Sequence, residues 1–172
     1  MNYFELYDLP VSFHPNQDVV KQQFYALSKK YHPDFYINES AEKQDEVLEL
    51  STLNNKAFQV LKNPQKVLQY VLELKGMVNE GESYTLPQSF LMEMMDVNEI
   101  IMDLQFDSDA EKLAQVKKEI EVIEQSLSDE LLSYTKEFEN TKEEQKQSLA
   151  KIKDLYYRSK YIQRLKESLT KL

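Results

Sequence analysis

The sequence predicts an all-α protein with an N-terminal helical hairpin and a C-terminal antiparallel three-helix bundle. Apolar residues recur every three or four positions along most of the chain, as on one face of a helix, and no window alternates as a strand would. Helix-breaking residues gather in one place, because both glycines, Gly76 and Gly81, precede Pro87, the last of the five prolines. We therefore expect three segments, which are a unit at 1–75, a linker at 76–86 and a unit at 87–172.

Composition limits the classes of function. The formal net charge is −9, whereas general nucleic-acid binders and proteins that attach to acidic membranes carry a basic field. The absence of cysteine excludes disulfides and thiolate metal sites. No run reaches the roughly eighteen apolar residues of a membrane span, and the opening MNYFELYDLP lacks a signal-peptide pattern. We expect a cytoplasmic protein without nucleic-acid or membrane partners.

Prolines and capping residues set the expected helices of the N-terminal unit. Pro33 has no amide hydrogen to donate and so ends the helix before it, and Ser40 is a suitable N-cap for the next one. The expected helices cover a short stretch from Asn2 to Pro10, then about 18–31, 40–62 and 64–74. Two of them carry an inward stripe at helical spacing, made of Val20, Phe24, Leu27 and Tyr31 in one and of Val47, Leu50, Asn54, Ala57 and Leu61 in the other.

Residues 88–172 contain no glycine or proline and predict three longer helices. Pro87 suits a first helical position, and two capping-box patterns, Ser108 with Glu111 and Thr141 with Glu144, divide the remainder. The middle helix has a near-heptad stripe at Leu113, Val116, Ile120, Ile123, Leu127, Leu131, Tyr134 and Phe138. Short loops between amphipathic helices favour an antiparallel bundle. A parallel coiled-coil dimer is the alternative, and the two capped breaks count against it.

The stretch KKYHPDFY at 29–36 contains His32, one of only two histidines in the chain. A general base needs an orienting partner and a substrate pocket, and a metal needs several ligands. Asp34 is near in sequence, yet no nucleophile elbow, phosphate loop or metal-ligand spacing accompanies it. The acidic series Glu93, Asp96, Glu99 and Asp103 lacks the Glu-x-x-His element of di-iron bundles. We expect no enzyme activity, no catalytic residue, no metal and no cofactor, and a metal-dependent enzyme is the alternative.

His-Pro-Asp ends an amphipathic helix with a basic outer face, and a longer helix follows after a short loop. This arrangement resembles the J-domain, the module that stimulates ATP hydrolysis by DnaK-type heat-shock chaperones. The resemblance implies that the loop stimulates the ATPase and that the basic face docks on an acidic chaperone surface. Carried onto this chain, the loop is His32, Pro33 and Asp34, and the docking face is Lys21, Tyr25, Lys29 and Lys30. Phe35 stands where the family usually has Lys or Arg, and Gln23 where arginine is common.

The helix after Pro87 has more apolar residues than one face can bury. A 4-3-4-3 stripe suffices for a bundle core and consists of Phe90, Met94, Val97, Ile101 and Leu104. The remaining apolar residues are Leu91, Met92, Met95 and Met102, with Asp96, Glu99 and Asp103 interleaved. An apolar patch that is rich in flexible methionines and bordered by acidic side chains indicates a surface that binds a partner protein. Packing of these methionines against the interdomain face or against the other helices is the alternative.

The chain as a whole resembles the HscB family of J-protein co-chaperones, which serve iron–sulfur cluster biogenesis. The segments that carry the resemblance are YFELYDLP at 3–10, LNNKAF at 53–58 and LPQSFLMEMMDVNE at 86–99. It implies two partners, an HscA/DnaK-type chaperone ATPase and an IscU-type cluster scaffold. The scaffold-binding residues that it implies are Leu91, Met92, Met95, Asp96, Glu99, Asp103 and, on the last helix, Tyr157.

We therefore expect a bacterial co-chaperone that delivers the scaffold to the chaperone and promotes cluster transfer, while catalysis belongs to the partner. Two alternatives remain, which are a general J-protein for other clients and a structural coiled-coil adaptor.

Overall fold

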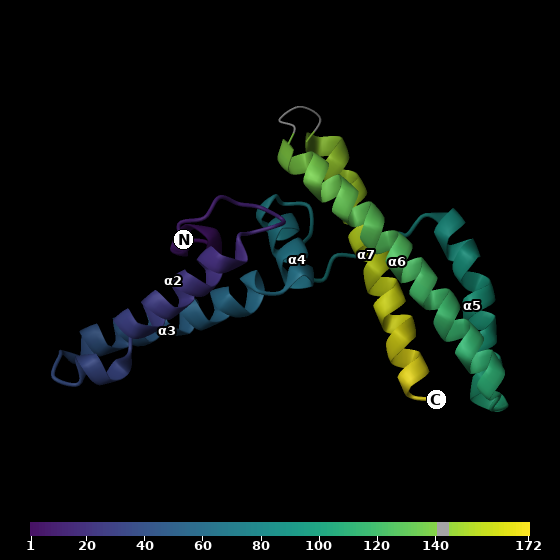
Figure 1. Ribbon diagram of the computed structural model, residues 1–172, viewed down its shortest axis with the longest axis horizontal. Helices are drawn as coiled ribbons and strands as arrows, with labels where there is room; N and C mark the ends of the chain where they lie inside the picture. The colour runs from purple at the N-terminus through teal and green to yellow at the C-terminus, as the bar shows by residue number, and fades with distance from the viewer. Residues whose placement is uncertain (141–144) are drawn as a thin grey trace. The chain divides into compact units, whose positions relative to one another are not determined.

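The structure is a computed structural model that describes residues 1–140 and 145–172 (Figure 1). These residues form seven α-helices and one short 3-10 helix and include no strand, so the all-α class is confirmed. They divide into two compact units, Met1–Lys75 and Gly76–Leu172, which we describe in turn. None of the described helices combines the length and the apolar character that a membrane span requires.

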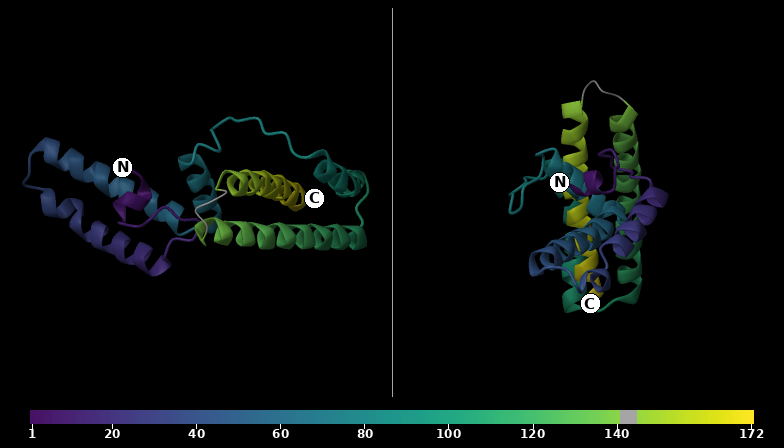
Figure 2. Two further views of the ribbon diagram at one scale, coloured as in Figure 1. Left: turned by 90° about the horizontal axis from the view of Figure 1, so that it is seen from above. Right: turned by 90° about the vertical axis from the view of Figure 1, so that its left-hand side faces the viewer.

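The first unit is built on two antiparallel helices joined at a tip. Helices α2 (Gln17–Lys30) and α3 (Ala41–Leu61) lie side by side in every view, and the 3-10 helix η1 (Pro33–Tyr36) lies in their connection (Figures 1 and 2). The short helix α1 (Tyr3–Leu6) and the last helix α4 (Pro64–Leu74) both contact α3. Ser40 caps α3, because its hydroxyl accepts the Lys43 N–H at 3.2 Å, as the sequence predicts.

A buried asparagine connects three segments of the first unit. The Oδ1 atom of Asn54 on α3 accepts the Tyr7 hydroxyl at 2.7 Å, just after α1. Its Nδ2 donates to two groups of α2, the Phe24 carbonyl at 3.2 Å and the Ser28 hydroxyl at 3.1 Å. Burial raises the pKa of the Tyr7 hydroxyl, which therefore remains a donor at neutral pH. The Asn54 amide is 1% exposed and uses both its oxygen and its nitrogen, as a buried amide must.

The second unit is a three-helix bundle made of α5 (Gln88–Phe106), α6 (Ala110–Asn140) and α7 (Gln145–Thr170) (Figure 1). Successive helices run in opposite directions, which confirms the predicted antiparallel arrangement. Each helix contributes one stripe to a shared apolar core, whose buried members are Phe90, Met94, Val97, Ile101, Leu104, Val116, Ile120, Leu127, Leu155, Ile162, Leu165 and Leu169. The five core positions predicted for α5 are therefore all buried.

Two helix starts in the second unit differ from the sequence prediction. Pro87 is the N-cap of α5 and lies one residue before its first helical position. The expected capping box at Ser108 is wrong, because the carboxylate of Asp109 caps α6 instead and accepts the N–H groups of Glu111 and Lys112 at 3.0 and 3.2 Å. A carboxylate there also faces the positive end of the helix dipole. The box expected at Thr141 and Glu144 lies outside the described residues.

We expect Asn54→Ala to destabilise the first unit by about 2–3 kcal/mol, because it removes three side-chain hydrogen bonds and leaves a cavity. Hydrogen–deuterium exchange of the full chain, read by mass spectrometry, should show faster exchange in α2 and α3 and unchanged exchange in α6. Asn55→Ala is the matched control, since Asn55 is the exposed neighbour on the same helix. Equal exchange in the two variants would contradict the role of Asn54.

Candidate functional site

The His-Pro-Asp motif forms a compact turn at the tip of the first unit. His32 is the N-cap of η1, and its Nδ1 accepts the Asp34 N–H at 3.3 Å. The Asp34 carboxylate lies 3.7 Å from the same nitrogen, and the Phe35 N–H donates to the His32 carbonyl at 3.1 Å. The Tyr36 hydroxyl donates to the Lys30 carbonyl at 2.8 Å, which ties η1 to the end of α2. Pro33 fixes the first helical position of η1.

This turn presents most of its side chains to solvent. His32 and Asp34 are both exposed, so the imidazole is held by contacts within the turn itself. Among the described residues, no three histidine, aspartate or glutamate side chains lie together as metal ligands would. The turn is thus an exposed segment that is held by its own hydrogen bonds.

The predicted docking face lies along the exposed side of α2. Lys21, Tyr25 and Lys29 follow one another at intervals of four residues and are all exposed, so they share one side of the helix. Lys30 is also exposed, with its Nζ 5.3 Å from the centre of the Tyr31 ring. Lys29 and Lys30 therefore lie at the end of α2 that leads into the tip with His32, whereas Tyr25 and Lys21 lie farther back along the same helix.

The predicted scaffold-binding residues of α5 lie opposite the core stripe. Met92 and Met95 are 63% and 65% exposed, which rules out the alternative that they pack against other helices of the unit. Leu91 is exposed as well, and so are the carboxylates of α5, Asp96, Glu99 and Asp103. Two further apolar side chains continue this surface, Met102 at 59% and Phe106 at 89% exposed. Met102 was not among the predicted site residues and Phe106 was missed, although the four-residue spacing of Phe106 from Met102 was the signal.

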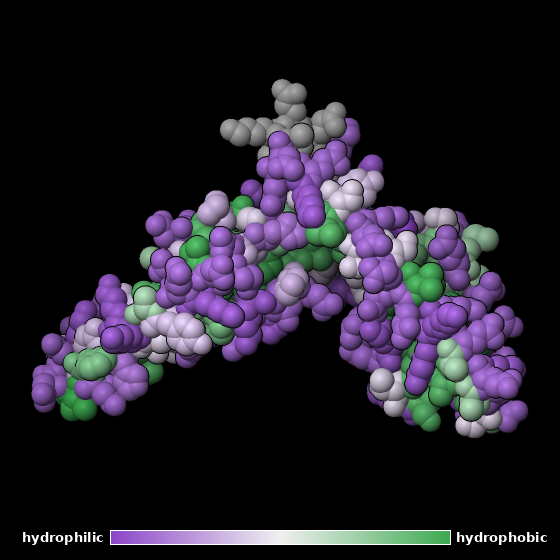
Figure 3. All heavy atoms as spheres, viewed as in Figure 1, coloured by the Kyte–Doolittle hydropathy of each residue, from purple (hydrophilic) through white to green (hydrophobic). Residues whose placement is uncertain are grey.

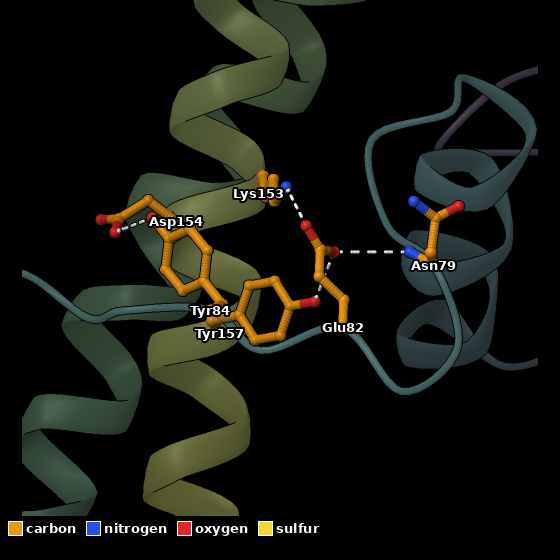
Figure 4. Close-up of polar contacts among 6 residues, drawn as sticks. All are labelled: Asn79, Glu82, Tyr84, Lys153, Asp154 and Tyr157. Atoms are coloured by element: carbon orange, nitrogen blue, oxygen red, sulfur yellow. Dashed lines mark hydrogen bonds and ion pairs between the residues drawn. The ribbon is translucent and has the colours of Figure 1, made fainter.

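Tyr157 on α7 lies in a different environment, formed by the segment before α5. We call this segment, residues 76–87, the strap. The Tyr157 hydroxyl donates to Glu82 of the strap at 3.0 Å, and its ring stacks on Tyr84 with 4.4 Å between the centroids (Figure 4). Lys153 donates to the other Glu82 oxygen at 2.8 Å, and the Tyr84 hydroxyl donates to Asp154 at 2.7 Å. The segment predicted to be a linker is therefore attached to α7 along part of its length.

Electrostatics fix the protonation of this cluster. Hydrogen bonds from Lys153 and then Tyr157 hold the pKa of Glu82 below its usual 4.5. Burial, followed by the hydrogen bond to Glu82, raises the pKa of Tyr157 to about 12, and burial followed by Asp154 raises that of Tyr84 to about 12. At neutral pH an ionised glutamate thus accepts from a neutral tyrosine and a charged lysine. The contacts of Tyr157 join it to the strap, and the contacts of the α5 residues do not include it.

We expect acid to release the strap. A carboxyl with a lowered pKa contributes stability that is complete above its unfolded value, here 4.5, and that is lost as the pH falls through the lowered pKa. The nuclear Overhauser contacts between the Tyr84 and Tyr157 rings should weaken over that range, before the α6 amides lose protection. Glu82→Gln should weaken them already at pH 7, whereas Glu80→Gln, at an exposed strap position, should behave as the parent does. Ring contacts that persist in Glu82→Gln would contradict the assignment.

Comparison with known sequences identifies relatives along most of the chain. The model of the family described as the HSCB C-terminal oligomerisation domain matches residues 86–170. The Co-chaperone protein HscB homolog of Vibrio vulnificus (strain CMCP6) is 34% identical over 139 residues, which cover 75% of this chain and 81% of that protein. The homolog from Pasteurella multocida (strain Pm70) is 32% identical over 133 residues, which cover 76% of this chain and 77% of that protein.

Solved structures give the same result. The chaperone HscB from Vibrio cholerae is similar with a TM-score of 0.70 and 27% identity, over 99% of this chain and 96% of that one. The human co-chaperone protein HscB has a TM-score of 0.75 at 22% identity over 99% and 81% of the two chains, a likeness that concerns the fold alone. The family resemblance that the sequence predicts is confirmed, and the chain belongs to the HscB family of co-chaperones.

Proposed function

We propose that the protein stimulates the ATPase of an HscA/DnaK-type chaperone and brings an IscU-type iron–sulfur scaffold to it, promoting cluster transfer. In this proposal residues 1–75 are the J-domain, 76–86 are the linker and 87–172 bind the scaffold. Catalysis belongs to the chaperone, and the protein itself supplies two binding surfaces. Holding both partners on one chain raises the effective concentration of the scaffold at the chaperone. We place this activity in the cytoplasm.

The proposed chaperone site is the tip together with the α2 face. Pro33 and the hydrogen bonds of the turn hold Asp34 and His32 in one conformation, so little entropy is lost when they dock. The exposed lysines Lys21, Lys29 and Lys30 attract an acidic partner surface, and their effect on the association rate falls with added salt. Tyr25, exposed in the same row, offers an amphipathic contact at its centre.

The proposed scaffold site is carried by one observation, the exposure of Met92 and Met95 beside acidic side chains. Methionine adapts its shape to a partner surface, and carboxylates at the edge select for basic groups. Tyr157 is also part of the proposed site, but the strap already engages it through the stacked Tyr84 ring and the Glu82 carboxylate.

We expect His32→Gln to abolish stimulation of the cognate chaperone ATPase in a steady-state assay with the full-length protein. His14→Gln is the matched control, because His14 also precedes a proline and is also exposed. Stimulation by the control should equal that of the parent, and the helical content of both variants should be unchanged. If His32→Gln stimulated as well as the parent, the tip would not be the chaperone site, and the coiled-coil adaptor would become the better account.

We expect the double variant Met92→Ala with Glu99→Ala to weaken scaffold binding by roughly a hundredfold, since it removes a buried apolar contact and a charged one. Isothermal titration of the full chain with purified IscU-type scaffold measures the change. Val122→Ala with Glu121→Ala removes the same kinds of side chain from an exposed part of α6 and should bind like the parent. A parent protein that does not bind the scaffold would favour a general J-protein for other clients.

A further inference from the structure

The exposed apolar surface of α5 extends well beyond the residues assigned to the scaffold site. Leu91, Met95, Met102 and Phe106 are separated by four, seven and four residues, and all four are exposed. With about 100° of rotation per residue, they fall within a sector of about 60°, and they span about 22 Å along the helix. We call this row the α5 stripe.

The far half of the α5 stripe lies outside the bundle core. Met102 is 59% and Phe106 is 89% exposed, whereas the nearby core positions Ile101 and Leu104 are buried. An aromatic ring left almost wholly in water at a helix end has no folding role and is typical of a binding hot spot. Figure 3 shows apolar surface at this end of the bundle, where the ends of α5 and α7 come together.

A groove adjoins the end of the stripe. It has a volume of about 450 Å³ and lies between the end of α5 and the end of the chain. Its lining combines three apolar residues, Leu104, Phe106 and Leu172, with the polar Gln105, Ser108, Ser168 and Lys171. A side chain from a partner that follows the α5 stripe past Met102 would enter it beside the Phe106 ring. Burial of that ring against an apolar side chain would supply more contact energy than any other single residue of the stripe.

We infer that the scaffold contact runs along the whole α5 stripe and ends on Phe106, so that Met102 and Phe106 are specificity-determining residues of the scaffold site. This inference rests on the proposed function. It requires a partner with an apolar ridge at least as long as the stripe and with basic groups along one side. The basic groups face Asp96, Glu99 and Asp103, which follow the stripe at its edge.

Charge argues for this partner over a second copy of the chain. Every copy carries the same acidic row, no lysine or arginine lies between Lys75 and Lys112, and the net charge is −9. Two copies that met through α5 would bring acidic surfaces together, at a cost in binding free energy. A scaffold with basic groups complements the row instead.

The test is titration of purified IscU-type scaffold into the full chain and its variants. Phe106→Gln should weaken binding about tenfold and Met102→Gln several-fold, because each loses a buried apolar contact. Phe106→Leu should stay within about threefold of the parent, since it keeps most of the apolar area. Val122→Gln is the control, because Val122 is 64% exposed on α6 and lies off the stripe. Thermal unfolding of all variants should match the parent.

The outcomes separate the inference from the proposed function. If Phe106→Gln and Met102→Gln bind like the parent while Met92→Ala binds weakly, the contact stops before Met102, and only the inference fails. If the parent does not bind the scaffold, both fail. If sedimentation shows a dimeric parent and a monomeric Phe106→Gln, a second copy covers the stripe and the inference is wrong.

Discussion

Helix α5 has more apolar side chains than the bundle can bury, and the second unit is organised around that excess. One face of α5 completes the core through Phe90, Met94 and three further residues. The opposite face, with Met92 and Met95, is largely exposed among the described residues of the unit, and the strap attaches to α7 instead. The acidic row beside the methionines keeps this face hydrated in the free protein and restricts which partners can cover it. Stability and the proposed recognition thus use different sides of one helix.

The two units hold their proposed recognition surfaces in different ways. In the first unit the buried amide of Asn54 holds α2 against α3. Hydrogen bonds within the His-Pro-Asp turn and from the Tyr36 hydroxyl to the Lys30 carbonyl then hold the tip. In the second unit the core is apolar, and the polar contacts of Glu82 and Tyr84 lie outside it, between the strap and α7. Consequently the residues proposed to contact partners are exposed in both units, and substitutions there act on binding with little effect on folding.

Local rules predicted most of the fold, and contacts between distant segments account for what was missed. Proline and capping chemistry placed the helices of the first unit, and helical spacing identified the core residues of α5, because both depend on neighbours in sequence. Ser108 was predicted to cap α6, whereas Asp109 caps it in the structure. Both residues have side chains that can cap a helix, and only the backbone conformation decides between them. The partner of Tyr157 lies 75 residues away at Glu82, and no periodic signal reports such a pair. The four-residue spacing between Met102 and Phe106 could have placed Phe106 on the same face of α5. Its exposure, however, depends on where the bundle ends.

The central claim is that one chain carries both surfaces and joins their partners. The most direct test is the chaperone ATPase rate in the presence of scaffold, measured with an equimolar mixture of two variants, His32→Gln and Met92→Ala with Met95→Ala. Each variant keeps one surface and lacks the other. The account predicts that the mixture stays well below the parent, because the scaffold and the functional tip are on different chains and tethering is lost. A mixture that matches the parent would show that the two surfaces act independently, and would contradict the account.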